Sequence, residues 1–277
     1  EKHRPLMAGI IGAAANVGFA LMGLITMNVT VDQNSWRWVA IVGAAPALLT
    51  FVIRLFVPES EKWHDAVKSS TTPSQPLRDI FRPGLLGHTM IAIALSSVAL
   101  IGTWGSVQWL PLLADKMVGA TNTGAKGLTG MLSGIGAIVG CLGGAWIGGF
   151  FSRRVMYFMI CLGSLVSCAI LFRMVEGYGP MFLIFTFIVG GLTAAFYGFF
   201  PLYLPELFPT RVRATGQGLS YNAGRILAAF GAIYGGQLVQ AFDGSYARAG
   251  AIITLVYVVG MAIIWLAPET KGKPLPP

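Results

Sequence analysis

The sequence predicts an all-α membrane protein with eight transmembrane helices. Hydrophobic residues make up 55% of the 277 residues and charged residues only 11%, well below the roughly 25% charged residues of a soluble domain. The mean hydropathy is +0.70. These values favour a chain that crosses a membrane repeatedly.

Three cysteines lie in apolar runs, so we interpret them as packing residues and expect no disulfide framework: Cys141, Cys161 and Cys168.

Eight apolar stretches are long enough to span a bilayer, which takes about 20 helical residues. They cover residues 6–29, 36–57, 86–112, 127–151, 155–175, 180–204, 215–240 and 247–267. Most connections between them are only a few residues long, so neighbouring helices must be antiparallel. The exception is the polar stretch 58–85, which we interpret as a linker between two bundles.

The basic residues predict the orientation of these helices. With the linker and both termini in the cytoplasm, about 13 of the 19 Lys and Arg residues lie inside, as the positive-inside rule requires. Five lie outside: Arg37, Lys116, Lys126, Arg173 and Arg248. Because the basic residues are scattered singly and form no patch with aromatic residues, the net charge of +8 does not indicate a nucleic-acid partner.

Glycines recur every four residues in the fourth stretch, at Gly136, Gly140, Gly144 and Gly148. Such a ridge has no side chains, so another helix can approach it closely. It is also compatible with a helix that moves when one bundle rocks against the other. We keep both interpretations.

One charge lies in the middle of an apolar stretch. From Thr215 to Val239, the only ionisable side chain that is charged at neutral pH is Arg225, which a helical rise of about 1.5 Å per residue places close to the bilayer midplane. A lone charge there costs at least about 2.5 kcal/mol, so it must face protein, water or ligand. Its partner could be a substrate carboxylate, an acid on another helix, or backbone carbonyls together with Asn222.

Signatures of enzymes, metals and cofactors are missing from the sequence. It has no Gly-x-Ser-x-Gly nucleophile elbow, no phosphate-binding loop with Lys and no zinc pattern. His3, His64 and His88 have no second ligand at metal spacing. We therefore expect no enzyme activity, catalytic residue, metal or cofactor. No carboxylate lies deep in a stretch, so the sequence leaves proton coupling open.

Four blocks of the sequence occur in a characteristic order: "WRWVAIVGAAPALLTFVIRLFVPESEKW" (36–63), "GGFFSRR" (148–154), "PELFPTRVRATG" (205–216) and "PETKG" (268–272). Together they resemble the major facilitator superfamily, in particular its sugar-porter and organic-acid symporter branches. The second block departs from the family pattern, because Gly149 and Phe150 stand where the family has Asp and Arg. A charged latch at that turn is therefore incomplete.

The resemblance implies that the eight helices correspond to family helices five to twelve. Residues 1–57 would then be the last two helices of the first six-helix half, 58–85 the cytoplasmic linker, and 86–277 the second half. We expect the chain as given to insert into a membrane but not to transport, because the cavity needs first and fourth helices that it lacks.

The resemblance also implies a solute cavity lined by family helices seven and ten. The candidate substrate-binding residues are Trp104, Gln108, Thr193, Tyr197, Asn222 and Arg225. Packing of an aromatic face is the alternative for Trp104, Gln108 and Tyr197. Asn16 and Asn222 could each make a hydrogen bond between helices.

Charged residues at the cytoplasmic helix ends form a candidate gate latch, since opposite charges can pair when that side closes and separate when it opens. These gating residues are Glu59, Arg153, Arg154, Glu206, Arg211, Arg213 and Glu269. The alternative is that they are solvated helix ends that contribute little to stability.

We therefore expect a secondary transporter that moves a small polar solute by alternating access. A midplane Arg suits an organic anion, and the "GRI" at 224–226 resembles the eleventh helix of aromatic-acid and related organic-acid proton symporters. A sugar transporter, symporter or uniporter, is the alternative, and a non-transporting sensor of the same fold is a further one. We expect a monomeric, multi-pass protein of the plasma (cell inner) membrane, with the solute, the lipid bilayer and, if transport is coupled, protons as its partners.

Overall fold

The computed structural model describes residues 4–29, 36–56, 75–119, 122 and 124–276. In these residues the regular secondary structure consists of helices joined by turns and loops, with no strand. The elements in chain order are α1 (Arg4–Asn28), α2 (Trp36–Ala44), η1 (Ala45–Ala47), α3 (Leu48–Phe56), α5 (Pro76–Asp79), α6 (Pro83–Trp104), η2 (Val107–Trp109), α7 (Leu110–Val118), α8 (Ala125–Gly148), α9 (Arg153–Met174), α10 (Pro180–Tyr203), η4 (Leu204–Leu207), α11 (Arg213–Ala241), α12 (Tyr246–Ile253), α13 (Val256–Ile263) and η5 (Ile264–Leu266).

Several of the predicted membrane helices consist of more than one helical segment. The Gly-x-x-Pro sequence that ends at Pro46 divides one of them into α2, η1 and α3, because proline cannot donate the backbone hydrogen bond that a continuous helix needs. Another runs from α6 through η2 to α7 and changes direction at Gly105 and Ser106. The last consists of α12, α13 and η5.

Within the described residues, seven helical segments are long and apolar enough to cross a membrane. The predicted all-α membrane bundle is therefore confirmed. The remaining long helix, α11, has 29 residues but is not among the seven, because glycine, Ser, Asn, Gln and Arg lower its hydropathy.

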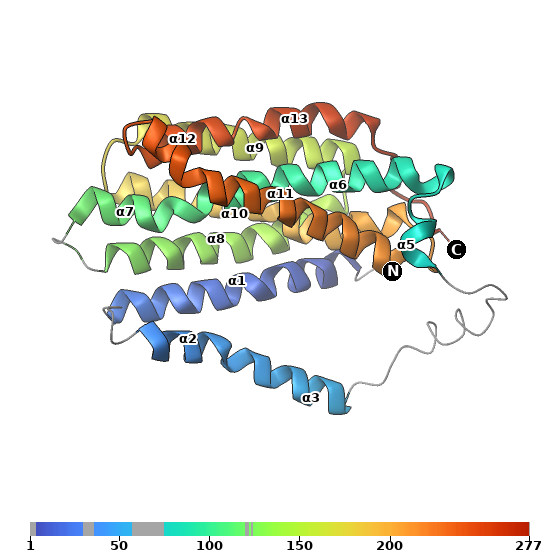
Figure 1. Ribbon diagram of the computed structural model, residues 1–277, viewed down its shortest axis with the longest axis horizontal. Coiled ribbons are helices and arrows are strands. Elements are labelled where there is room, and N and C mark those ends of the chain that lie inside the picture. Colours follow the sequence, from blue (N-terminus) through green and yellow to red (C-terminus); the bar gives the residue numbers. More distant parts are fainter. Residues whose placement is uncertain (1–3, 30–35, 57–74, 120–121, 123, 277) are drawn as a thin grey trace.

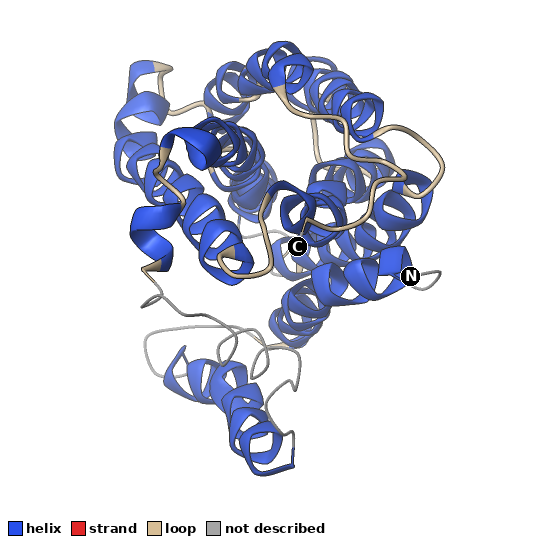
Figure 2. Cartoon of the chain, turned by 90° about the vertical axis from the view of Figure 1, so that its right-hand side faces the viewer, coloured by secondary structure: helices blue, strands red, loops and turns tan. Residues whose placement is uncertain are grey.

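The helices lie side by side along the long axis of the molecule (Figure 1). The helix α8 packs against α1 on one side and α10 on the other, and α11 packs against α6. Aromatic side chains fill the core between α9, α10 and α13, where the ring of Phe196 stacks on Tyr257 at 5.9 Å with an interplanar angle of 8°. Figure 2 looks along the helices and shows them gathered in one bundle, with the α2–α3 segment to one side.

The glycine ridge of α8 packs against α10, as the spacing predicts. A Cβ atom on Gly144 would lie 2.9 Å from the Cβ of Ala195, and one on Gly140 would overlap the backbone of Gly191. The neighbouring face of α8 packs equally closely against α1, since a Cβ on Gly134 would lie 2.8 Å from the Cα of Ala20. The two helices approach too closely there for side chains to fit between them.

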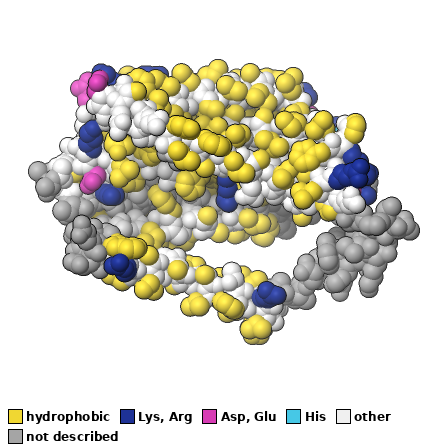
Figure 3. All heavy atoms as spheres, viewed as in Figure 1, with side chains coloured by type: hydrophobic (Ala, Val, Ile, Leu, Met, Phe, Trp, Pro, Cys, Tyr) yellow, Lys and Arg dark blue, Asp and Glu magenta, His cyan; other side chains and the backbone are white. Residues whose placement is uncertain are grey.

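The segment from α2 to α3 buries little of its surface. Val39 is the buried residue of α2, and none of the α3 residues is buried. Hydrophobic side chains cover most of the molecular face in Figure 3, and charged side chains gather mainly toward its two ends. This distribution suits a bundle surrounded by lipid.

Candidate functional site

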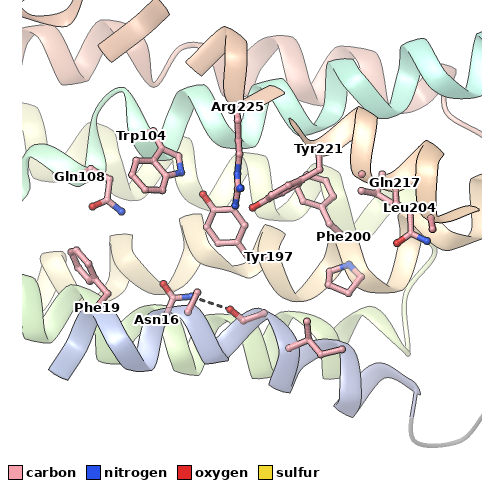
Figure 4. Close-up of a pocket in the computed structure, with 16 residues that line it drawn as sticks. Asn16, Phe19, Trp104, Gln108, Tyr197, Phe200, Leu204, Gln217, Tyr221 and Arg225 are labelled. Carbon is pink, nitrogen blue, oxygen red and sulfur yellow. Dashed lines mark hydrogen bonds between the residues drawn. The ribbon is translucent and has the colours of Figure 1, made fainter. Parts of the chain in front are cut away.

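A cavity of about 720 Å³ opens between α1, the α6–η2 region, α10, η4 and α11. Its lining is mostly apolar and aromatic, with a few polar side chains, which is typical of a small-molecule site. Figure 4 shows the cavity with α11 on one wall and α1 on the opposite wall. The lining residues are Ile11, Gly12, Ala15, Asn16, Phe19, Trp104, Gln108, Tyr197, Phe200, Pro201, Leu204, Ala214, Gln217, Gly218, Tyr221 and Arg225.

Arg225 supplies the positive charge of this cavity. Its guanidinium lies over the ring of Tyr221, one helical turn earlier on α11, at 4.8 Å from the ring centroid. From there the side chain extends across the cavity toward Tyr197 on α10 (Figure 4). Neither Asp nor Glu is among the lining residues, so the cavity wall that the structure describes has a positive charge and no negative one.

Two further hydrogen-bond donors lie beside the guanidinium. The hydroxyl of Tyr197 is buried and has no hydrogen-bond partner among the described residues, although Thr103 and Trp104 lie next to it. The indole of Trp104 can only donate, and its nitrogen points toward Tyr197 and Arg225 in Figure 4. Arg225 and Trp104 therefore bring donors to one place in the cavity, beside the buried hydroxyl of Tyr197.

On the opposite wall, Asn16 is held by two hydrogen bonds that its amide nitrogen donates. The Nδ2 atom donates to the carbonyl of Gly12 at 3.1 Å and to the Sγ of Cys141 at 3.5 Å. Cys141 in turn donates to the carbonyl of Ala194 at 3.1 Å. The expected hydrogen bond of Asn16 to another helix is therefore present, and it joins α1 to α8.

The structure brings together four of the six predicted substrate-binding residues, Trp104, Gln108, Tyr197 and Arg225. Thr193 is buried, and its hydroxyl donates to the carbonyl of Val189 at 2.7 Å.

Asn222 donates to the carbonyl of Gly218 at 2.8 Å and lies outside the cavity lining. The face of α11 that meets the cavity is centred on Gly218, Tyr221 and Arg225, so Asn222 lies at its edge.

Sequence reasoning did not assign Asn16, Gln217 or Tyr221 to the site. Spacing could have found two of them, because Tyr221 and Gln217 lie four and eight residues before Arg225, which is one face of a helix. Asn16 lies on α1, and no local pattern connects it to the other lining residues.

Within the described residues, the elements that carry the candidate gating residues, namely the start of α9, η4 and the start of α11, lie at the end of the bundle where both termini are found (Figure 1). Arg153 and Glu206 form a bidentate ion pair there, with Nε–Oε2 and Nη2–Oε1 distances of 2.9 Å. Both side chains are buried, at 8% and 5% exposure. Arg153 also donates to the carbonyl of Gly148 at 2.7 Å, and the hydroxyl of Thr270 donates to Glu206 at 2.6 Å.

Glu269 caps the start of α9. Its carboxylate accepts from the backbone nitrogens of Arg153 and Arg154 at 3.0 and 3.2 Å, and from that of Lys271 at 3.0 Å. Burial raises the pKa of this carboxyl, but the hydrogen bonds from these backbone N–H groups outweigh burial, so the pKa lies below its ordinary value of 4.5. The Nε of Arg154 donates to the carbonyl of Ala267 at 2.7 Å.

The other candidate gating residues have different surroundings. Arg213 donates to the backbone carbonyls of Pro205, Phe208 and Pro276. Arg211 pairs with the buried Asp79 of α5 at 3.3 Å, so it ties α5 to the segment just before α11. Glu59 lies outside the described residues.

A bundle of membrane helices around a cavity that is mostly apolar and aromatic, with a few polar side chains, is the architecture of a solute carrier. The chain belongs to the Major Facilitator Superfamily, whose sequence model matches residues 1–232. It is therefore an integral, multi-pass membrane protein.

Individual relatives agree with this family membership. The chain is 26% identical to a putative metabolite transport protein of Haemophilus influenzae over 99% of its own length and 68% of the relative. It is 25% identical to a probable 4-methylmuconolactone transporter of Cupriavidus pinatubonensis, covering 98% of the chain and 63% of that relative. It is 24% identical to a cis,cis-muconate transport protein of Acinetobacter baylyi, covering 82% and 56%. The chain thus spans roughly 56–68% of the length of these relatives.

Proposed function

We propose that the chain forms part of a secondary transporter that binds a small organic anion in the cavity and carries it across the plasma membrane by alternating access. The observation that carries this proposal is the position of Arg225, which projects into an aromatic cavity whose described lining has no acidic residue. A guanidinium offers a planar fork of donors that matches a carboxylate. Trp104 adds a donor beside it.

The names of two relatives favour an organic anion over a neutral solute. One relative is called a cis,cis-muconate transport protein and another a sialic acid transporter. At 24–26% identity, these names suggest a substrate class and not a particular substrate. We extend only that class to this chain.

The ion pairs lie at the end of the bundle where both chain termini are found (Figure 1), and they suit a gate. We propose that Arg153, Glu206 and Glu269 hold α9, η4 and the segment after η5 together when this side is closed. Opening would separate Arg153 from Glu206, and Arg153 would then find water or another acceptor. The orientation that suits the basic residues places this gate in the cytoplasm, with residues 58–85 as the linker between an N-terminal part (1–57) and the second six-helix half (86–277).

The substitution Arg225→Lys tests the anion site. Lysine keeps the charge but not the planar fork, so we expect binding of cis,cis-muconate or phenylacetate to weaken at least about tenfold, which is 1.4 kcal/mol. Binding is measured by titration calorimetry on protein in lipid nanodiscs. Arg173→Lys, an exposed position at the end of α9, is the matched control and should bind like the wild type.

A sugar is the competing substrate class, and the cavity has features that suit one. The amides of Asn16, Gln108 and Gln217 could bond hydroxyl groups, and Trp104, at 50% exposure, could stack on a sugar ring. Two results together would replace the anion proposal with this one. The protein would bind D-glucose saturably, and carboxylate binding would be either absent or unchanged in a folded Arg225→Lys variant.

A further inference from the structure

Asn16 is the one amide in the cavity lining whose orientation the described structure determines. Its nitrogen donates to two acceptors, the carbonyl of Gly12 and the sulfur of Cys141. Rotating the amide by half a turn would set its oxygen against the Gly12 carbonyl, where two acceptors would repel each other. The sulfur must accept from Asn16, because the thiol hydrogen already points to Ala194.

With the nitrogen occupied, the Oδ1 of Asn16 is left for the cavity. Figure 4 shows the oxygen turned toward the cavity interior and the nitrogen toward Gly12, along the dashed line. An amide oxygen can only accept hydrogen bonds. The α1 wall therefore offers an acceptor, whereas the opposite wall offers the donors of Arg225 and Trp104.

The other two amides differ in this respect. Gln108 and Gln217 also line the cavity, but no hydrogen bond within the described residues holds either amide in one orientation. Each can present its oxygen or its nitrogen to a solute, so neither discriminates between a donor and an acceptor. Asn16 does discriminate between donors and acceptors, because a solute atom that carries no hydrogen leaves the Oδ1 of Asn16 without a hydrogen bond.

We propose that Asn16 is a specificity-determining residue, and that the preferred organic anion carries a hydroxyl or amine donor on the side opposite its carboxylate. This inference rests on the proposed anion site at Arg225. The carboxylate contacts Arg225, and the distal donor bonds the Oδ1 of Asn16. Cys141 is a positioning residue, because it acts only by holding the amide of Asn16.

Three probes of similar size separate donor recognition from carboxylate binding: 4-hydroxyphenylacetate, 4-methoxyphenylacetate and phenylacetate. Only the first has a distal donor, and the methoxy oxygen can only accept. One neutral hydrogen bond corresponds to about three- to tenfold in affinity. We expect wild-type protein in nanodiscs to bind the hydroxy compound more tightly than the other two by that factor.

Variants then assign the preference to Asn16. Asn16→Ala should bring the hydroxy-to-methoxy affinity ratio close to one while phenylacetate binding is retained. Asn28→Ala is the matched control, because Asn28 lies on the same helix and also donates to the carbonyl four residues earlier, but it does not line the cavity. This control should keep the wild-type ratio.

Cys141 gives a second test that leaves Asn16 in place. Cys141→Ala should reduce the ratio, because the amide can then rotate, and Cys141→Ser should preserve it, since a hydroxyl can also donate to Ala194 and accept from Asn16. A wild-type ratio near one, or a ratio that survives in Asn16→Ala, overturns the role of Asn16 but leaves the anion site standing. Failure of all three probes to bind contradicts the anion site itself.

Discussion

Arg153 and Glu206 pair at 2.9 Å through two parallel contacts while both side chains remain below a tenth exposed. The residues are 53 positions apart, so the pair fastens the start of α9 to η4. Removing one member of a buried pair leaves the other charge without compensation. Substituting only one of the two residues should therefore lower the stability of the fold strongly.

We expect Glu206→Gln and Arg153→Met each to lower the free energy of unfolding by about 3–5 kcal/mol. The exposed pair of Arg248 and Asp243, at 3.9 Å with 69% and 94% exposure, is the control, and Arg248→Ala should change stability by less than about 0.5 kcal/mol. Denaturant titration in detergent micelles measures both. If Glu206→Gln and Arg153→Met changed stability as little as Arg248→Ala does, Arg153 and Glu206 would be no more than solvated helix ends.

The glycine ridge predicts a position-specific effect of adding one methyl group. Gly140→Ala places a Cβ in the backbone of Gly191, whereas nothing lies within 4 Å of a Cβ at Gly143 on the same helix. We expect Gly140→Ala to cost at least about 1–3 kcal/mol, the usual effect of overpacking, and Gly143→Ala to be neutral. Thermal unfolding followed by tryptophan fluorescence compares them.

The pH dependence of stability should contain a contribution from Glu269. Its folded pKa lies below 4.5, so the ionised carboxylate stabilises the fold above the unfolded value, and this stabilisation is lost as the pH falls through the folded pKa. The stability difference between wild type and Glu269→Gln should therefore be largest near pH 6 and shrink toward pH 3. A difference that grows on acidification would contradict the assigned direction.

The proposed orientation can be tested with single cysteines in a background where the three native cysteines are replaced by alanine. Asn122, in the exposed turn before α8, should react with an impermeant thiol reagent from outside the cell when replaced by cysteine. Lys273, in the exposed tail, should react only after the membrane is permeabilised. The reverse labelling pattern would invert the topology and place the ion pairs outside.

Periodic and compositional features predicted much of this structure. The spacing of Gly136, Gly140 and Gly144 predicted a close helix contact. A lone charge in a long apolar stretch was enough to single out Arg225, because burying it in lipid is costly.

Features that depend on helix rotation or distant contacts could not be predicted in this way. Small residues occur on several faces of α11, so the sequence did not show that Tyr221, and not Asn222, faces the cavity. The orientation of Asn16 depends on Cys141, which is 125 residues away. The charges at the helix ends indicated that ion pairs form, but not that Glu206 pairs with Arg153 while Arg213 bonds backbone carbonyls.

The polarity of α11 has a consequence for biosynthesis. A translocon releases a segment into lipid according to its hydrophobicity, and α11 is less apolar than the seven described segments that could cross a membrane. Its partner α6 is synthesised earlier and can shield the polar face. We therefore expect α11 alone to insert poorly in a glycosylation-mapping assay and to insert efficiently behind α6, so that the helix carrying Arg225 enters the bilayer only with the help of a helix made before it.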